Sequence, residues 1–287
     1  MEDHSSPGYT HPVDTMRALP TYIIAGAMRS GTSALNSYLR QHPEVGVSSN
    51  KETHFFDHFF DNGLDWYRDL FPEEGKFVAV GEATPNYMFS TTALDRIQRT
   101  LPEVKRVVIL RNPIDRAYSH YWHDRVRNKV SAEFDKVVQE EITGNPSPDA
   151  YLARGIYRPQ LEEILMRFTR DLVLVQIFEE MATDPKSVYS TVCRFIGVDD
   201  TFIPDALGDP VNKYIEFRSL AARNWSRRLP GRARNLVGRL NAKREETYPE
   251  MDTSTRSQLE EYFRVENRRL TELIDIEIPW LQPGLPG

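Results

Sequence analysis

The chain has 287 residues, 40% of them hydrophobic and 11% aromatic, which is enough for a sizeable core in one large domain or at most two. Its formal net charge of −6 argues against a nucleic-acid-binding protein, and its single cysteine, Cys193, excludes an internal disulfide. Since no apolar run reaches the roughly 20 residues of a spanning helix, we expect a soluble, cytoplasmic protein. Residues 1–18 are predicted to form a flexible tail, and residues 19–287 a single domain.

Short apolar runs alternate with helical patterns along the chain. The runs predicted to be buried strands are Thr21–Gly26, Lys76–Pro85, Lys105–Pro113 and Asp171–Glu179. Apolar residues at helical spacing occur in segments 33–42, 91–101, 113–122, 184–197 and 255–274. This alternation predicts an α/β fold, a P-loop-like three-layer arrangement in which helices cover both faces of a central parallel sheet. Ligands of such sheets bind at the carboxyl ends of strands.

The first loop, GAMRSGTS at residues 26–33, joins a predicted strand to a predicted helix. The amides expected to be free at the helix start are those of Ser30, Gly31, Thr32 and Ser33. Free amides and the helix dipole favour an anion there, and Arg29 adds a fixed positive charge. Thr32 stands where an ATP-binding loop has its lysine, which argues against an NTPase. The alternative is an ordinary strand-to-helix turn.

A second candidate anion site follows the strand at Lys105–Pro113. Arg111 lies at the end of that strand, and a helix is predicted to start at Pro113. Ser119 comes about two turns into that helix, so the two side chains can converge on one oxyanion. The alternative is that Arg111 and Ser119 share no role.

Together, the two regions resemble the signature regions of the PAPS-dependent sulfotransferases, where PAPS is 3′-phosphoadenosine 5′-phosphosulfate. The resemblance implies that the first loop holds the 5′-phosphosulfate and that Arg111 and Ser119 hold the 3′-phosphate. Further segments are similar to the heparan-sulfate-type branch of that family, which suggests a soluble member of bacterial type. They are NKETHFFDHFFDNGLDWYRDLFP (50–72), EATPNYMF (82–89), RGIYRPQLEEILMRF (154–168) and the final IPW (278–280).

Two positions depart from the pattern of that branch. Arg29 stands where its members usually carry lysine, and both residues are cations. Ala83 follows Glu82 where many members carry a lysine that contacts the acceptor or the sulfonate. The second departure argues against a heparan-like acceptor.

The resemblance and the position after the first helix make Glu52 the candidate base for an acceptor hydroxyl. His54, two residues on, is expected to orient that base or contact the sulfonate, and Lys51 to add positive charge. Glu82 is the alternative base, or else it pairs with a cation. Further candidates for contact with the acceptor are Asp57, Tyr87 and Tyr157. The alternative for the whole segment is a loop with packed phenylalanines and solvated charges.

Residues 218–244 contain nine Lys or Arg and no Asp or Glu, although the whole chain is acidic. This segment, extended to about residue 250, is interpreted as a lid over the donor, with Lys243 and Arg244 as phosphate contacts, or as a solvated basic helix.

The leading hypothesis is transfer of a sulfonate from PAPS to a hydroxyl of a sugar or natural product, with adenosine 3′,5′-bisphosphate as the second product and without a metal. The alternatives are a magnesium-dependent kinase and a non-catalytic nucleotide-binding protein. The sequence leaves the acceptor, O- against N-sulfation and the oligomeric state open.

Overall fold

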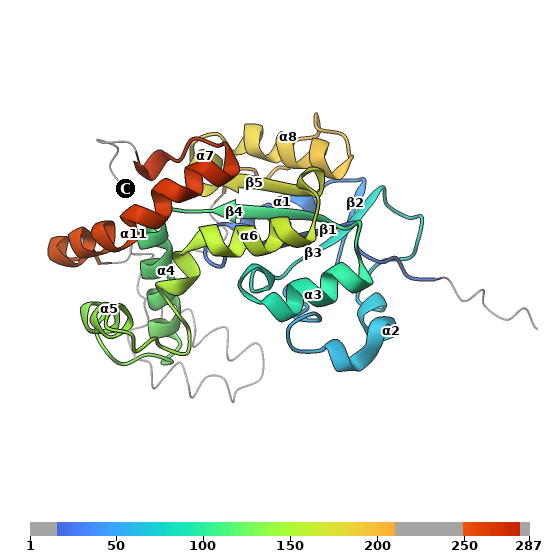
Figure 1. Ribbon diagram of the computed structural model, residues 1–287. Coiled ribbons are helices and arrows are strands. Elements are labelled where there is room, and N and C mark those ends of the chain that lie inside the picture. Colours follow the sequence, from blue (N-terminus) through green and yellow to red (C-terminus); the bar gives the residue numbers. More distant parts are fainter. Residues whose placement is uncertain (1–15, 210–248, 282–287) are drawn as a thin grey trace, which may run out of the picture.

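A five-stranded sheet with strand order β2-β3-β1-β4-β5 forms the centre of the molecule, and all neighbouring strands are parallel (Figure 1). The computed structural model describes residues 16–209 and 249–281, so the basic segment 218–244 with Lys243 and Arg244 lies outside the described residues. The strands are β1 (Tyr22–Gly26), β2 (Val45–Val47), β3 (Ala79–Ala83), β4 (Lys105–Leu110) and β5 (Val173–Ile177).

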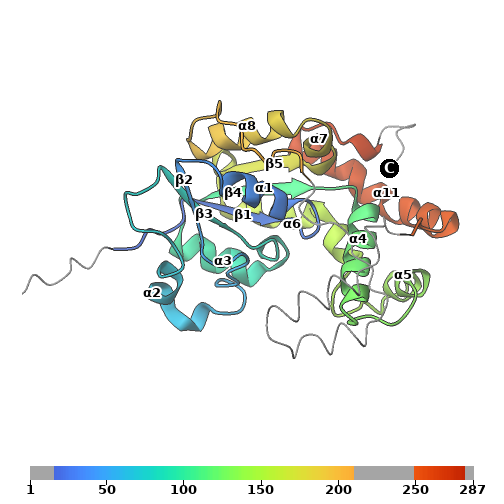
Figure 2. The same ribbon diagram turned by 180° about the vertical axis from the view of Figure 1, so that it is seen from behind.

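Helices cover both faces of this sheet, as the two opposite views show (Figures 1 and 2). One face carries α3 (Thr91–Thr100), α6 (Tyr157–Arg167) and α11 (Thr253–Ile274). The other face carries α1 (Thr32–Leu39), α7 (Phe178–Thr183) and α8 (Pro185–Ile196). The remaining helices are α2 (Gly63–Arg68), α4 (Pro113–Val126) and α5 (Phe134–Ile142), of which α4 and α5 lie beyond the carboxyl end of β4.

The strands are buried on both faces because their apolar residues alternate between two cores. In β1, Ile23 and Ala25 pack on the side of α3 and α6, whereas Tyr22 and Ile24 pack on the side of α1 and α8. A third apolar cluster joins α4, α5 and α11, with Ala117 of α4 fully buried within it. This cluster fixes α4 against the body of the domain.

The central parallel sheet between helices is the predicted fold, and the structure confirms it. The strand β2 is not predicted from the sequence, because it has only three residues, Val45–Val47, and polar residues follow it. The predicted tail ends too late: the amide of Ala18 donates to the carbonyl of Pro72 (2.9 Å), and Arg17 pairs with Glu73 across a β-bridge. None of the helices that the structure describes combines the length and apolar composition that crossing a bilayer requires.

Candidate active site

A cavity of about 620 Å³ brings the two predicted anion sites and the candidate base together. Arg29 and the start of α1 reach it from the carboxyl end of β1, and Arg111 reaches it from the end of β4. Ser119 of α4 adds a hydroxyl to the lining, and Glu52, from the loop after β2, adds a carboxylate. Because β1 and β4 are parallel neighbours, their ends deliver Arg29 and Arg111 to the same edge of the sheet.

The first loop requires glycine at position 31. Gly31 precedes α1 with φ of 84°, a left-handed conformation that costs little only for glycine. A β-carbon there would also lie 2.3 Å from Met181 and 2.8 Å from Phe178, both on α7. The loop therefore lies close against α7, which forms another wall of the cavity.

The start of α1 offers backbone donors to this cavity. No side chain caps α1, and within the described residues no acceptor pairs with the amides of Gly31, Thr32 or Ser33. The amide of Ser30, by contrast, donates to the carbonyl of Ala27 at 3.2 Å. The helix start therefore presents three of the four amides expected to bind an anion.

Arg29 connects the two anion sites. Its Nε and Nη2 both donate to Oγ of Ser119, each at 3.2 Å, and its own carbonyl accepts from Nη1 of Arg111 at 3.1 Å. Arg29 adopts a positive φ of 69°, which is uncommon for a residue other than glycine. The contacts with Ser119 and Arg111 hold this conformation and place two guanidinium groups on one cavity.

Besides its contact with the Arg29 carbonyl, Arg111 makes two further contacts. Its guanidinium lies over the ring of Phe178, 4.6 Å from the centroid, and its carbonyl accepts from the hydroxyl of Tyr157 at 2.9 Å. Burial lowers the pKa of Arg111, but the guanidinium stays charged because its ordinary pKa is so high. A buried, preorganised cation of this kind is suited to bind a phosphate.

Within the described residues two carboxylates line the cavity, Glu52 and Asp209, and two cations flank Glu52. Nζ of Lys51 lies 2.8 Å from its Oε1, and Nε2 of His54 lies 3.4 Å from its Oε2. The other ring nitrogen of His54, Nδ1, lies 3.0 Å from Oδ2 of Asp57, so the imidazole bridges two carboxylates. Glu52 and His54 both have positive φ, 60° and 50°, values uncommon for residues other than glycine, and of the two only Glu52 lines the cavity.

The bridge through His54 controls the charges at this end of the cavity. The hydrogen bond with His54, with a smaller contribution from Lys51, lowers the pKa of Glu52 to about 2. Hydrogen bonds to Asp57 and then to Glu52 raise the pKa of His54 to about 9. At neutral pH the site therefore holds an ionised Glu52 beside a protonated His54.

Comparison with known proteins identifies the family. The model of the family described as "Sulfotransferase domain" matches residues 19–270. The chain belongs to the sulfotransferase family. It is 31% identical over 280 residues to the bifunctional heparan sulfate N-deacetylase/N-sulfotransferase 1 of Mus musculus, covering 91% of this chain and 30% of that protein. It is 28% identical over 267 residues to the human heparan sulfate glucosamine 3-O-sulfotransferase 3B1, covering 92% of this chain and 65% of that protein.

A solved structure has the same fold as this chain. The sulfotransferase of Alicyclobacillus acidocaldarius superposes with a TM-score of 0.71 and 28% identity, covering 92% of this chain and all of that one. The chain spans less than two thirds of the length of each of these two curated relatives. The predicted membership of the heparan-sulfate-type branch is confirmed by these matches.

Glu82, the alternative base, does not line the cavity and is fully buried. Four hydroxyls surround its carboxylate: Thr53 (2.6 Å), Thr84 (2.6 Å), Tyr67 (2.5 Å) and Tyr87 (3.3 Å). Burial raises the pKa of Glu82, although these hydrogen bonds partly oppose the increase. Among the described residues it pairs with hydroxyls, so the expected pairing with a cation is not found.

Several predicted ligand contacts do not fit the structure. Ser30 is fully buried and does not reach the cavity. Tyr87 and Tyr157 are also buried, and their hydroxyls are bonded to Glu82 and to the carbonyl of Arg111. Asp57 accepts from Asn86 (2.7 Å) as well as facing His54, so it positions the imidazole instead of lying open to an acceptor. Sequence alone places these polar side chains near the site without showing which way they point.

Three basic residues of the cavity were missed by the sequence analysis: His123, Arg127 and Lys129. The first two follow Ser119 at intervals of four residues, the spacing that places side chains on one face of a helix. That spacing from Ser119 was the available signal. Arg127 and Lys129, just past the end of α4, extend the positive wall of the cavity beyond Ser119, whereas burial lowers the pKa of His123.

Proposed function

We propose that this chain transfers a sulfonate group from PAPS to a hydroxyl of a sugar or small-molecule acceptor. The observation that supports the proposal most is that Arg29, Arg111 and Ser119 line the same cavity as the ionised Glu52. Two phosphate-binding sites and one candidate base therefore lie on the same cavity. Membership of the sulfotransferase family supports sulfonate transfer as the reaction of this site.

The donor end of the cavity is assigned to the first loop and to Arg111. PAPS supplies an electrophilic sulfur, and as the acceptor oxygen bonds to it the sulfur–oxygen bond to the phosphate breaks, releasing adenosine 3′,5′-bisphosphate. Arg29 and the amides of Thr32 and Ser33 stabilise the negative charge that develops on the leaving phosphate. Arg111 and Ser119 bind the 3′-phosphate. The guanidinium group and the hydroxyl both donate hydrogen bonds to its oxygens.

Glu52 is assigned as the general base that removes the proton of the acceptor hydroxyl. It is ionised and therefore able to accept, and His54 holds it in place through Nε2 at 3.4 Å. Asp57 fixes the opposite nitrogen of the same ring, so the imidazole cannot turn away. Lys51, 2.8 Å from Glu52, adds positive charge where the sulfonate passes.

The acceptor is assigned to the class of carbohydrates or small alcohols. The names of the relatives, which act on heparan sulfate, support a sugar. Ala83 supports an acceptor other than heparan sulfate. Its side chain is buried in the apolar cluster beside α1 and supplies no charge to the cavity. The lysine that many family members carry at this position therefore has no counterpart on β3.

Two measurements on the full chain test the proposal. In thermal unfolding, a ligand at about 100 times its dissociation constant stabilises by roughly 2.7 kcal/mol, so adenosine 3′,5′-bisphosphate should raise the transition temperature and ATP with magnesium should not. Labelled PAPS with a panel of sugars and alcohols should then give a labelled product. Stabilisation by ATP with magnesium alone would favour a kinase, and binding of the bisphosphate without transfer to any acceptor would favour a non-catalytic protein.

A further inference from the structure

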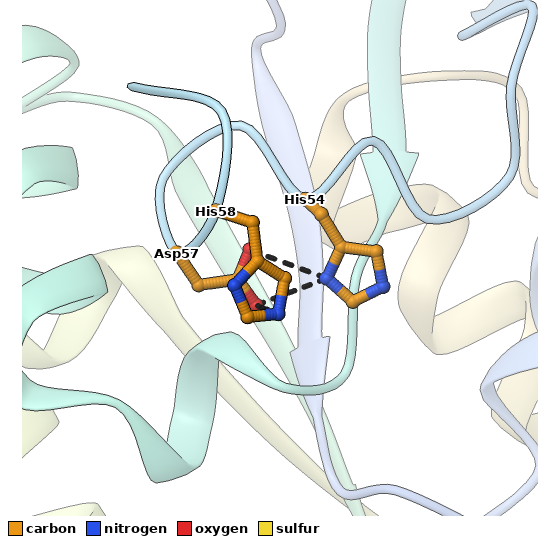
Figure 3. Close-up of side chains that lie close together, drawn as sticks. All are labelled: His54, Asp57 and His58. Carbon is orange, nitrogen blue, oxygen red and sulfur yellow. Dashed lines mark hydrogen bonds and ion pairs between the residues drawn. The ribbon is translucent and has the colours of Figure 1, made fainter. Parts of the chain in front are cut away.

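The turn after Glu52 places two histidines beside one carboxylate. The carbonyl of His54 accepts from the amides of His58 and Phe59, both at 2.9 Å, which closes a single helical turn. The side chains of His54, Asp57 and His58 therefore lie on the same side of this turn. Figure 3 shows dashed lines from the His54 ring to the Asp57 carboxylate, over which the His58 ring is drawn; the centroids of the two imidazole rings are 5.1 Å apart.

The ligand atoms of these three groups lie close enough together to converge on one metal ion. Nδ1 of His54 lies 3.0 Å from Oδ2 of Asp57, and Nε2 of His58 lies 3.8 Å from the same oxygen. One ligand atom from each residue lies within 4.8 Å of the others. Zinc bonds of about 2.0–2.1 Å in a tetrahedron place ligand atoms about 3.3 Å apart, a value between the two observed distances. Since the His58 side chain is 61% exposed, its ring is free to make the small adjustment needed.

Neighbouring groups already hold these ligands as a metal site requires. A histidine that binds a metal through one nitrogen usually donates from the other to a carboxylate, which fixes the ring. Nε2 of His54 faces Oε2 of Glu52 at 3.4 Å and leaves Nδ1 directed at Asp57. Asp57 is itself held by Asn86, which donates at 2.7 Å and accepts from Arg154 at 2.9 Å.

We propose that His54, Asp57 and His58 bind a divalent transition-metal ion such as Zn²⁺ or Co²⁺. Two imidazoles and one carboxylate are ligands that such ions prefer, and three protein ligands leave one coordination position open. Metal binding requires Nδ1 of His54 to be free of a proton, since a histidine binds a metal through an unprotonated nitrogen. The site lies beside the cavity of about 620 Å³, next to Glu52.

A second group with comparable distances lacks this character. His120, Asp124 and Asp149 also have potential ligand atoms within 4.8 Å of one another. The positive charges of Arg116 and Arg154 act on His120, however, and Lys129 already pairs with Asp124 at 3.4 Å. These cations compensate the carboxylates and oppose the entry of a metal ion.

Metal binding should slow sulfonate transfer. An ion bound by Asp57 takes that carboxylate away from its present role of positioning the His54 imidazole, and with it Glu52. This consequence depends on the proposed function, whereas metal binding itself does not. Binding and activity are therefore measured separately, so that the failure of one does not decide the other.

The binding test uses the full chain without a histidine tag, freed of metal with a chelator. Titration with Co²⁺ is expected to give the visible absorption band of a tetrahedral nitrogen–oxygen site and to saturate at one ion per chain. Calorimetric titration with Zn²⁺ should show the same stoichiometry. In His58→Ala, which removes an exposed ring, we expect the affinity for Zn²⁺ to fall by more than the ~10- to 100-fold that loss of an outer partner causes.

The matched control is the double variant His4→Ala/His11→Ala, which removes two histidines of the first 15 residues and should bind both ions like the unaltered chain. Loss of binding in this control, or unchanged affinity in His58→Ala, would overturn the proposal. So would a titration with no tetrahedral band. For activity, the rate of each protein with Zn²⁺ is compared with its own rate in chelator, and His58→Ala should need at least about ten times more Zn²⁺ for half inhibition.

Discussion

Arg29 donates through both Nε and Nη2 to the hydroxyl of Ser119, at 3.2 Å each, across 90 residues of sequence. This contact unites the two anion sites that the sequence shows only separately. Two nitrogens of one guanidinium group make this contact. A lysine at the same position has a single side-chain nitrogen and cannot donate to Ser119 in this way.

We therefore expect Arg29→Ala to lower kcat by about 10²–10³, the usual cost of removing one group that stabilises developing charge. Arg29→Lys keeps the charge but loses the fork, so its rate should lie between those of Arg29→Ala and the unaltered chain. Steady-state kinetics with labelled PAPS measure both variants. Equal loss in the lysine and alanine variants would show that the fork, and not the charge, is what matters.

Arg111→Ala should weaken the binding of adenosine 3′,5′-bisphosphate. A hydrogen bond to a charged group contributes about 1.5–3 kcal/mol, which corresponds to roughly a 10- to 100-fold increase in Kd. Calorimetry measures the affinity, and thermal unfolding shows whether the variant stays folded. Arg158→Ala is the control, because Arg158 lies on α6 and pairs with Glu162 in a partly exposed ion pair. An unchanged affinity in Arg111→Ala would remove Arg111 from the phosphate site.

Glu52→Gln should keep the affinity for the bisphosphate and lower kcat by about 10²–10⁴, the range for a lost general base. Glutamine has nearly the same shape, so the loop at positive φ is not expected to rearrange. Single-turnover measurements with saturating labelled PAPS separate this loss from a loss of binding. Retention of full turnover would show that Glu52 is not the base.

Glu82→Gln should affect stability instead. The Glu82 carboxylate accepts from the hydroxyls of Thr53, Thr84 and Tyr67 within 2.6 Å, and an amide nitrogen in place of one oxygen cannot accept. Leaving buried hydroxyls without an acceptor costs about 1–3 kcal/mol each. The transition temperature should therefore fall by several degrees while turnover per folded molecule persists. A rate loss like that of Glu52→Gln, without destabilisation, would make Glu82 the base.

The sequence predicts the fold well where local pattern and burial agree. The strand at Lys105–Leu110 is apolar between charged ends, and its parallel neighbours follow from the alternation with helices. The pairing of Arg29 with Ser119 depends on how α4 docks, which no local pattern contains. Glu82 shows the same limit, because two of its partners, Thr53 and Tyr67, come from distant parts of the chain. Segment spacing therefore finds the right residues but not their mutual contacts.

The buried pair of His120 and Asp124 should make stability depend on pH. Burial lowers the pKa of His120 below its ordinary value of 6.5, so the folded chain keeps this ring neutral where the unfolded chain protonates it. Burial alone would raise the pKa of Asp124, but the hydrogen bond with His123 and nearby positive charges lower it.

Both shifts have the same sign, because in each case the unfolded chain binds more protons than the folded one. The contribution of His120 to stability is therefore present above pH 6.5 and is progressively lost as the pH falls below that value. The contribution of Asp124 is lost only at still lower pH, as its own carboxylate protonates. We expect the free energy of unfolding to fall between pH ~7 and ~5, as measured by urea denaturation at each pH. In His120→Asn the slope over this range should be smaller than in the unaltered chain, whatever the absolute stability of the variant. An identical slope would show that His120 is not the group responsible.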